Sequence, residues 1–429
     1  MINERFTLGI NYWPRRKAMF WWQRFDAGEV REELAHIADL GIHVVRFCLM
    51  WEDFQPQPDQ VDSAMLGNLQ TVLDAAQAAG VVAMPTLFTG HMSGANWLPA
   101  WAMQPAEGAE VKLSSIQRFI VAGRDHPGLP RDLYTDPHML AAQRLFIDAV
   151  VPRFADHAAL WGWDLGNESD LVCVAQTPDI GRRWLDAFIG RIRACDPDAR
   201  VTFGSHQLSL LADNGLRVDH LGAICDPLVM HAYPIYALED RGPGNVDFVR
   251  FCLALTEGLG GKPVLLQEFG ACTAPPGEPG RWIEVGPLRQ RTYLASEEEH
   301  AAYVGAVLQA AYDAGALGAW IWCYADYTED LWVLPPCDLA VHERTFGLVR
   351  RDGSEKPAAQ VVRRFAGRLG RGELGPPGTH RRRIQVNADD YYRDPAGNFA
   401  RLYADFIVPR VTSGPRPSRR SRGKSSRRS

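Results

Sequence analysis

Short apolar runs alternate with amphipathic stretches along most of the chain, in a pattern that repeats about eight times. The apolar runs are nearly continuous, as in parallel strands buried on both faces, and the stretches between them have helical periodicity. The predicted strands are Phe6–Tyr12, His43–Leu49, Val81–Phe88, Leu160–Gly166, Val201–Ser205, Leu228–Tyr233, Val264–Gly270 and Leu317–Tyr324. Eight alternating units predict an α/β protein and favour a closed (β/α)8 TIM barrel over an open doubly wound sheet.

Capping residues mark where several of the predicted helices begin. Asp62, Asp136-Pro137 and Thr177-Pro178 are N-cap signals, and two of them are followed by proline at the first helical position. Ser296 with Glu299 three residues later predicts a capping box. The sequence therefore predicts helices between the strands. No glycine-rich phosphate turn follows the first strand, which argues against a dinucleotide-binding fold.

The chain divides into a long barrel, a short appendage and a tail. We predict a catalytic barrel over residues 1–370, with long loops at 89–137 and 271–295 that follow the third and seventh strands. Residues 371–410 are predicted to be a linker and a small appendage packed on the barrel. The Ser/Arg-rich residues 411–429 are predicted to be a disordered basic tail.

Charge and composition narrow the class of protein. The net charge of -5 is the sum of an acidic body and a final twenty residues with eight basic and no acidic side chains. No run of about 18 apolar residues is present, so no membrane-spanning helix is predicted. The start of the chain lacks a signal-peptide pattern, and the eight cysteines are scattered, so a cytoplasmic location is expected. No aromatic residue interleaves the basic tail, which argues against a nucleic-acid partner.

Two glutamates stand at the carboxyl ends of predicted strands on opposite sides of the barrel mouth. Glu168 follows the fourth strand and Glu268 lies near the end of the seventh. A pair of carboxyl groups is what glycoside cleavage requires, one to donate a proton and one to attack or to activate water. A separation of about 5–5.5 Å would indicate retention of configuration, and about 6.5–9.5 Å would indicate inversion.

The motifs Asn167-Glu168 and Gln267-Glu268-Phe269-Gly270 resemble the signature of the clan-A retaining glycoside hydrolases. The resemblance is nearest to the family 5 cellulase and β-mannanase group, with features of families 2 and 42, and it extends over nearly the whole barrel. It implies a (β/α)8 fold, Glu168 as the acid/base and Glu268 as the nucleophile.

The same resemblance implies a set of residues around these two glutamates. Arg46 would support the nucleophile, and Asn167 would donate to the substrate 2-hydroxyl. His231 and Tyr233 match a His-x-Tyr pair near the same centre. The further candidates for substrate binding are Trp322 as the platform under the sugar, His91, Trp51 and Trp282.

These observations predict a retaining β-glycoside hydrolase that acts on β-linked oligosaccharides or glycosides. The sugar stays open among β-mannosidase, β-glucosidase, β-galactosidase and endo-glucanase or endo-mannanase types. A non-catalytic carbohydrate-binding barrel and a transglycosidase are the alternatives. No cofactor is implied, because the sequence has no HxH, HExxH or calcium-loop spacing, and the oligomeric state is left open.

Overall fold

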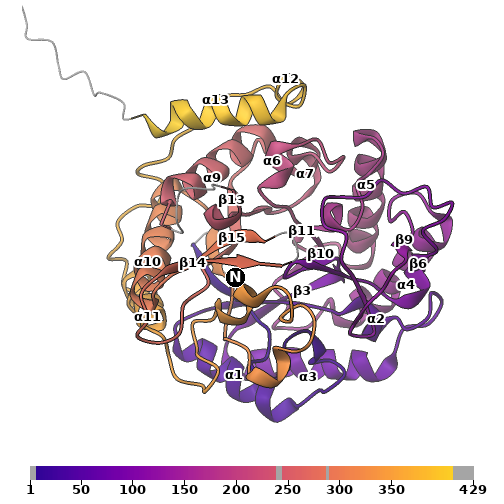
Figure 1. The fold of residues 1–429 in the computed structure, drawn as a ribbon, viewed down its shortest axis with the longest axis horizontal. Helices are drawn as coiled ribbons and strands as arrows, with labels where there is room; N and C mark the ends of the chain where they lie inside the picture. The colour runs from indigo at the N-terminus through magenta and orange to yellow at the C-terminus, as the bar shows by residue number, and fades with distance from the viewer. Residues whose placement is uncertain (1–5, 238–243, 287–288, 409–429) are drawn as a thin grey trace, which may run out of the picture.

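Eight parallel strands form the centre of the molecule, which the computed structural model describes over residues 6–237, 244–286 and 289–408 (Figure 1). The strands are β1 (Thr7–Asn11), β2 (Val44–Cys48), β3 (Val82–Thr89), β10 (Trp163–Asn167), β11 (Val201–Gly204), β12 (Leu228–His231), β13 (Val264–Phe269) and β16 (Gly318–Ile321). Each lies within a predicted strand or extends one residue beyond it. The strands pair in the order β11-β10-β3-β2-β1-β16-β13-β12.

The ring closes between β11 and β12 through a few backbone hydrogen bonds. The N–H of His231 donates to the carbonyl of Ser205 at 2.8 Å, and the N–H of Gln207 donates to the carbonyl of His231 at 3.1 Å. The predicted (β/α)8 barrel is therefore confirmed, and the carboxyl ends of all eight strands meet at one mouth.

A helix follows each barrel strand and covers the outside of the sheet. These helices are α1 (Ala27–Asp39), α3 (Ser63–Ala79), α4 (Pro137–Phe154), α5 (Pro178–Cys195), α7 (Val218–Ile224), α9 (Val246–Gly260), α10 (Glu297–Ala314) and α11 (Pro357–Gly370). Asp62, Asp136, Thr177 and Ser296 cap their helices as predicted, and Ser296 forms the predicted capping box with Glu299. None of the described helices combines the length and apolar character needed to cross a bilayer.

An apolar layer fills the barrel at the amino ends of its strands. Its buried members are Val44, Met84, Trp161, Val229, Leu265 and Trp320. Gly9 of β1 makes room for this layer, because a Cβ at that position would lie 2.3 Å from the Trp320 ring. Polar side chains follow further along the same strands, so the functional site rests on a packed apolar floor.

The two long loops form small structures of their own at the mouth. The loop after β3 contains β4 (His91–Met92), β5 (Ala95–Trp97), β6 (Met103–Gln104), β7 (Phe119–Val121), β8 (Arg124–Asp125) and β9 (Leu129–Pro130). The loop after β13 forms a hairpin of β14 (Arg281–Val285) and β15 (Gln290–Leu294). Short helices α2 (Trp51–Phe54), α6 (Leu208–Leu211) and α8 (Pro234–Ala237) begin other loops at the same end.

The C-terminal extension is helical and packs on the outside of the barrel. It contains α12 (Ala388–Tyr391) and α13 (Pro395–Ile407), and α13 lies next to α6 and α9 (Figure 1). Phe399, Tyr403 and Phe406 of α13 are buried, and all three rings pack on Phe251 of α9.

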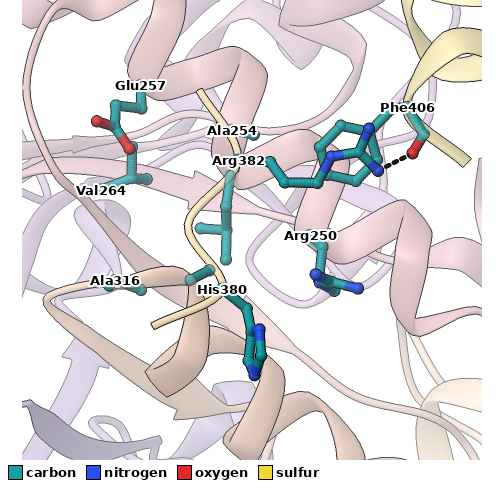
Figure 2. A pocket seen from close by; sticks show the side chains of 11 residues that line it. Arg250, Ala254, Glu257, Val264, Ala316, His380, Arg382 and Phe406 are labelled. Atoms are coloured by element: carbon teal, nitrogen blue, oxygen red, sulfur yellow. Dashed lines mark hydrogen bonds between the residues drawn. The ribbon is translucent and has the colours of Figure 1, made fainter. Parts of the chain in front are cut away.

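The segment that leads into these helices, residues 371–387, has no regular secondary structure and passes the amino end of β13. Figure 2 shows Arg382 of this segment donating a hydrogen bond to the carbonyl of Phe406, beside a small cavity of about 20 Å³. Val264, the first residue of β13, lines this cavity, so this segment lies at the amino end of the barrel, whereas the Tyr391 hydroxyl of α12 donates to the carbonyl of Leu210 in α6. The predicted tail at 411–429 lies outside the described residues, and the three-part division of the chain stays a prediction.

Candidate active site

The two predicted catalytic glutamates converge at the barrel mouth. Glu268 is part of β13, and Glu168 follows β10 directly, with a left-handed backbone at φ 48°. One oxygen of each carboxyl group and one ring nitrogen of His231 all lie within 4.8 Å of one another. This close approach is compatible with the short carboxyl separation of retaining enzymes.

Arg46 of β2 donates five hydrogen bonds, one to Glu268 and the others to Asn11, Asp164 and Asn167. Its Nη1 donates to Glu268 Oε1 at 2.5 Å and to Asn11 Oδ1 at 2.9 Å. Its Nε and Nη2 donate to Asp164 Oδ2 at 3.0 and 2.7 Å, and Nη2 also donates to Asn167 Oδ1 at 2.7 Å. The guanidinium is 1% exposed, and a buried cation of this kind is stable only because carboxylates surround it. Arg46 therefore fixes the position of Glu268 and faces it with a positive charge.

Tyr233 contacts the other oxygen of the nucleophile candidate. The Tyr233 hydroxyl donates to Glu268 Oε2 at 2.9 Å. Burial, together with the charge of Glu268, raises the pKa of Tyr233 well above its ordinary value, so the phenol keeps its proton. Both oxygens of Glu268 thus accept a hydrogen bond in this structure, and the carboxylate is fixed in orientation.

His231 lies between Glu168 and the floor of the site. Its Nδ1 is 2.7 Å from Glu168 Oε1, and its Nε2 is 2.9 Å from the side-chain oxygen of Gln267. The imidazole is fully buried. His231 is therefore both a core histidine and a direct partner of the acid/base candidate.

His206 and Asp170 are charged residues of the site that the sequence analysis missed. His206 follows β11, and its Nε2 lies 2.8 Å from Asp170 Oδ2, which also accepts from Asn214. Burial lowers the pKa of His206, but the charges of Asp170 and Glu168 outweigh burial and raise it to about 9. The position of His206, directly after a predicted strand, was the available signal, but its partner is 36 residues away in sequence.

The charges around Glu168 favour its ionised form when no substrate is bound. Burial raises the pKa of Glu168, but the charge of His206 and the hydrogen bond and charge of His231 outweigh it and lower the pKa to about 2. Oε1 of Glu168 and Nδ1 of His231 lie within hydrogen-bond distance, at 2.7 Å. Proton donation to a substrate must be considered for this pair and not for Glu168 alone.

His91 and Asn167 form the edge of the site next to Glu168. His91, on β4 of the loop after β3, accepts a hydrogen bond at its backbone oxygen from Asn167 Nδ2 at 2.6 Å. Nδ1 of the His91 ring lies 3.1 Å from Asn96 Oδ1. Burial lowers the pKa of His91. The structure therefore brings His91 beside the catalytic pair, despite its offset from the end of β3.

The three tryptophan candidates have different surroundings. Trp322 follows β16, and Gly270 permits its approach, since a Cβ on Gly270 would lie 2.2 Å from the Trp322 carbonyl. Trp51 packs against Phe88 and Trp101 and is 2% exposed, so it has no open ring face in this structure. Trp282 is 36% exposed on the β14–β15 hairpin, and its ring contacts are with residues of that hairpin.

Among the described residues, Glu168, His231 and Glu268 also bring three potential metal-ligand atoms within 4.8 Å of one another. However, Glu168 Oε1 already pairs with His231 Nδ1, and Nη1 of Arg46 lies 2.5 Å from Glu268 Oε1. A cation placed there would be repelled by Arg46 at short range. The arrangement is suited to proton transfer and nucleophilic attack.

Sequence comparison finds glycoside hydrolases over part of the chain. No family model matches the chain. The chain is 24% identical over 271 residues to mannan endo-1,4-β-mannosidase A of Hypocrea jecorina, covering 57% of this chain and 56% of that protein. It is 25% identical over 163 residues to a probable mannan endo-1,4-β-mannosidase F of Neosartorya fischeri, covering 33% of each. The chain thus spans about a third to somewhat over half the length of these curated relatives.

Structure comparison extends over nearly the whole chain. GH5_18 from Streptomyces cattleya, in complex with GlcNAc, matches with a TM-score of 0.74 and 21% identity, over 93% of this chain and 90% of that one. An exo-β-1,4-mannosidase from Opitutaceae bacterium strain TAV5 matches with a TM-score of 0.70 and 26% identity, over 93% of this chain and 66% of that one. The comparisons support a clan-A, family 5-like (β/α)8 barrel, as the motif resemblance predicted.

Proposed function

We propose that the protein is a retaining β-glycoside hydrolase that removes a terminal β-linked mannose from short oligosaccharides or glycosides. The approach of Glu168 and Glu268 to within 4.8 Å, with Arg46 on the nucleophile and His231 on the acid, is the observation that carries the proposal. Two carboxyl groups this close fit a double displacement.

The reaction proceeds in two steps. In the first, an oxygen of Glu268 forms a bond to the anomeric carbon while the bond to the leaving oxygen breaks, and Glu168 gives that oxygen a proton. In the second, water attacks the same carbon, its proton goes to Glu168, and the bond to Glu268 breaks. The hydrogen bonds from Arg46 and Tyr233 hold Glu268 in its orientation before attack.

Removal of single sugars is supported by the wall that the loop after β3 builds at the mouth. Its residues contact the loops of four strands. These contacts are Trp97 with Phe20 after β1, Trp101 with Trp51 after β2, Ser114 with Leu171 after β10, and Arg118 with Asp338 after β16. A loop held by contacts with the loops of four strands restricts the space on its side of the mouth, which favours a pocket for a chain end over an open groove.

The choice of mannose is supported by the similar proteins. The curated relatives are mannan endo-1,4-β-mannosidases, and one structural neighbour is an exo-β-1,4-mannosidase. A variant of GH5_18 from Streptomyces cattleya was solved with Manβ1-4GlcNAc. Together with the wall, these similarities favour a short β-mannoside over a long polymer.

A panel of aryl β-glycosides tests the reaction and the sugar. We expect turnover of 4-nitrophenyl β-mannoside with release of the β-anomer first, which proton NMR of the fresh product detects. A 2-deoxy-2-fluoro mannosyl fluoride should label Glu268, and Glu268→Gln should prevent labelling. Binding of sugars without any turnover or labelling would instead show a carbohydrate-binding barrel, and transfer to an added sugar acceptor in preference to water would show a transglycosidase.

Mannan oligosaccharides labelled at the reducing end test the exo action. We expect each labelled oligosaccharide to lose one mannose at a time from its unlabelled, non-reducing end. Early appearance of labelled fragments of mixed length would show internal cleavage and would contradict the pocket. Manβ1-4GlcNAc should be cleaved at a rate comparable with that of mannobiose.

A cytoplasmic location is also part of the proposal. All eight cysteines are free thiols, and seven of them are buried, which suits a reducing compartment. Cell fractionation with an antibody against the native protein tests this expectation, and recovery from the culture medium would contradict it.

A further inference from the structure

A buried chain of polar side chains runs from the Arg46–Asp164 ion pair to the catalytic acid. Asp164 Oδ1 accepts a hydrogen bond from the Thr202 hydroxyl at 2.8 Å, and Gln267 Nε2 lies 3.4 Å from the same hydroxyl oxygen. Gln267 Oε1 lies 2.9 Å from His231 Nε2, and His231 reaches Glu168. Asp164, Thr202, Gln267 and His231 are all fully buried, so water does not compete for these contacts.

The neighbours of Gln267 determine which way its amide points. The Thr202 hydroxyl hydrogen is used on Asp164, because a carboxylate that pairs with Arg46 accepts and does not donate. Thr202 Oγ1 therefore presents a lone pair to Gln267, and the Met84 sulfur, 3.6 Å away, is also an acceptor. Two acceptors on one side require the NH2 group of Gln267 there and its oxygen on the side of His231.

We infer that Gln267, oriented by Thr202 and Asp164, fixes a proton on Nε2 of His231 and so leaves Nδ1 as the atom that shares the catalytic proton with Glu168. Gln267 is a positioning residue for the acid, and the inference rests on the proposed hydrolysis. Loss of the shared proton would leave the Glu168 carboxylate facing the lone pair of Nδ1, which is unfavourable. The fixed tautomer thus makes the Glu168–His231 pair retain its proton to higher pH.

Other charged groups also face this pair and act on the pH profile. His206 after β11 and His91 on β4 lie near Glu168, and Glu268 Oε1 on β13 is 3.5 Å from His231 Nδ1. None of them contacts Nε2 of His231, whose described partner is Gln267. A change at Thr202 therefore alters the tautomer while it leaves these charges in place.

Thr202→Val tests the inference, with Thr202→Ser as the matched control. Valine has the shape of threonine but cannot orient Gln267, so the tautomer with hydrogen on Nδ1 becomes available and stabilises ionised Glu168. We expect the alkaline limb of kcat/KM to move down by about one pH unit. Phenyl β-mannoside, which needs a proton at its leaving oxygen, should lose about tenfold in kcat at pH 7.5, within the range of general acid catalysis. The dinitrophenyl glycoside, whose leaving group needs no proton, should change by less than about twofold.

The serine variant should behave like wild type for both substrates. An equal loss on the two substrates, or an unchanged alkaline limb in Thr202→Val, would overturn the inference. Gln267→Leu is the second variant if Thr202→Val does not fold, and the same shift is expected.

Nitrogen NMR of histidine-labelled protein keeps this test separate from the proposed function. The His231 signals, assigned by loss in His231→Asn, should show a proton-bearing Nε2 in wild type and a mixture of tautomers in Thr202→Val. A proton-bearing Nε2 in an enzyme that cleaves no glycoside would contradict the proposed function and leave the orientation by Gln267 intact. A neutral ring with hydrogen on Nδ1 in wild type would overturn the inference whatever the activity.

Discussion

Replacement of Arg46 by methionine is the most direct perturbation of the site, because one guanidinium supports two buried carboxylates. Arg46→Met removes five hydrogen bonds and leaves Asp164 and Glu268 without their cation. Breaking a buried ion pair on one side costs about 3–5 kcal/mol, since the remaining charge is uncompensated. Against a total stability of about 5–15 kcal/mol, this is a large fraction.

A double-mutant cycle with Asp164→Asn separates the charge from the packing. Arg46→Met leaves Asp164 and Glu268 without their cation, and Asp164→Asn leaves Arg46 with Glu268 alone, whereas the double variant removes the Arg46–Asp164 pair together. We expect the double variant to be more stable than the sum of the single losses by about 2 kcal/mol, within the range of coupling between neighbours. Unfolding in urea, followed through tryptophan fluorescence at pH 7, measures all four proteins.

A cost below about 1 kcal/mol for the single variant, or strict additivity in the cycle, would refute the role of Arg46 as the counter-ion of a buried carboxylate pair.

Four further outcomes follow from the structure. Glu168→Gln should reduce kcat about 10²–10⁴-fold on substrates with poor leaving groups, and azide should restore turnover of dinitrophenyl glycosides as a glycosyl azide product that mass spectrometry detects. Arg118→Ala removes the bidentate contact with Asp338 and should raise the rate of internal cleavage of mannan relative to mannobiose, measured by fragment length. Dialysis against EDTA should leave kcat unchanged, because Arg46 and not a metal ion faces Glu268; a loss restored by a divalent ion would contradict this. Burial raises the pKa of Glu33 to about 7. The contribution of protonated Glu33 to stability is therefore present below about pH 4.5 and is lost as the pH rises to 7. Relative to wild type, Glu33→Gln should gain up to roughly 3 kcal/mol of stability over this interval, measured by urea titrations.

The barrel could be predicted because its signals are local. Continuous apolar runs identified all eight strands, and the caps at Asp62 and Ser296 identified helix starts, since both depend on residues close together in sequence. The positions of Glu168 and Glu268 after strands then placed them at the mouth, because the fold brings the carboxyl ends of parallel strands together.

Contacts between distant segments could not be read from the sequence. The pairing of Arg118 with Asp338 spans 220 residues and depends on how the loops fold over the mouth. Trp51 follows a strand as a sugar platform would, but Phe88 and Trp101 cover it, and no local pattern distinguishes these cases. The helix α13 did have a local signal, since Asp394-Pro395 precedes apolar residues at helical spacing.

The location of the Arg46 hydrogen bonds has a consequence for how such an enzyme can vary. Every hydrogen-bond partner of Arg46 among the described residues belongs to a barrel strand. The wall at the mouth comes instead from the loop after β3. Exchange of that loop can alter the accepted oligosaccharide without touching the reacting groups. A single substitution of Arg46, in contrast, leaves the buried carboxyl groups of Asp164 and Glu268 without their cation, so this position can change only in compensated combinations.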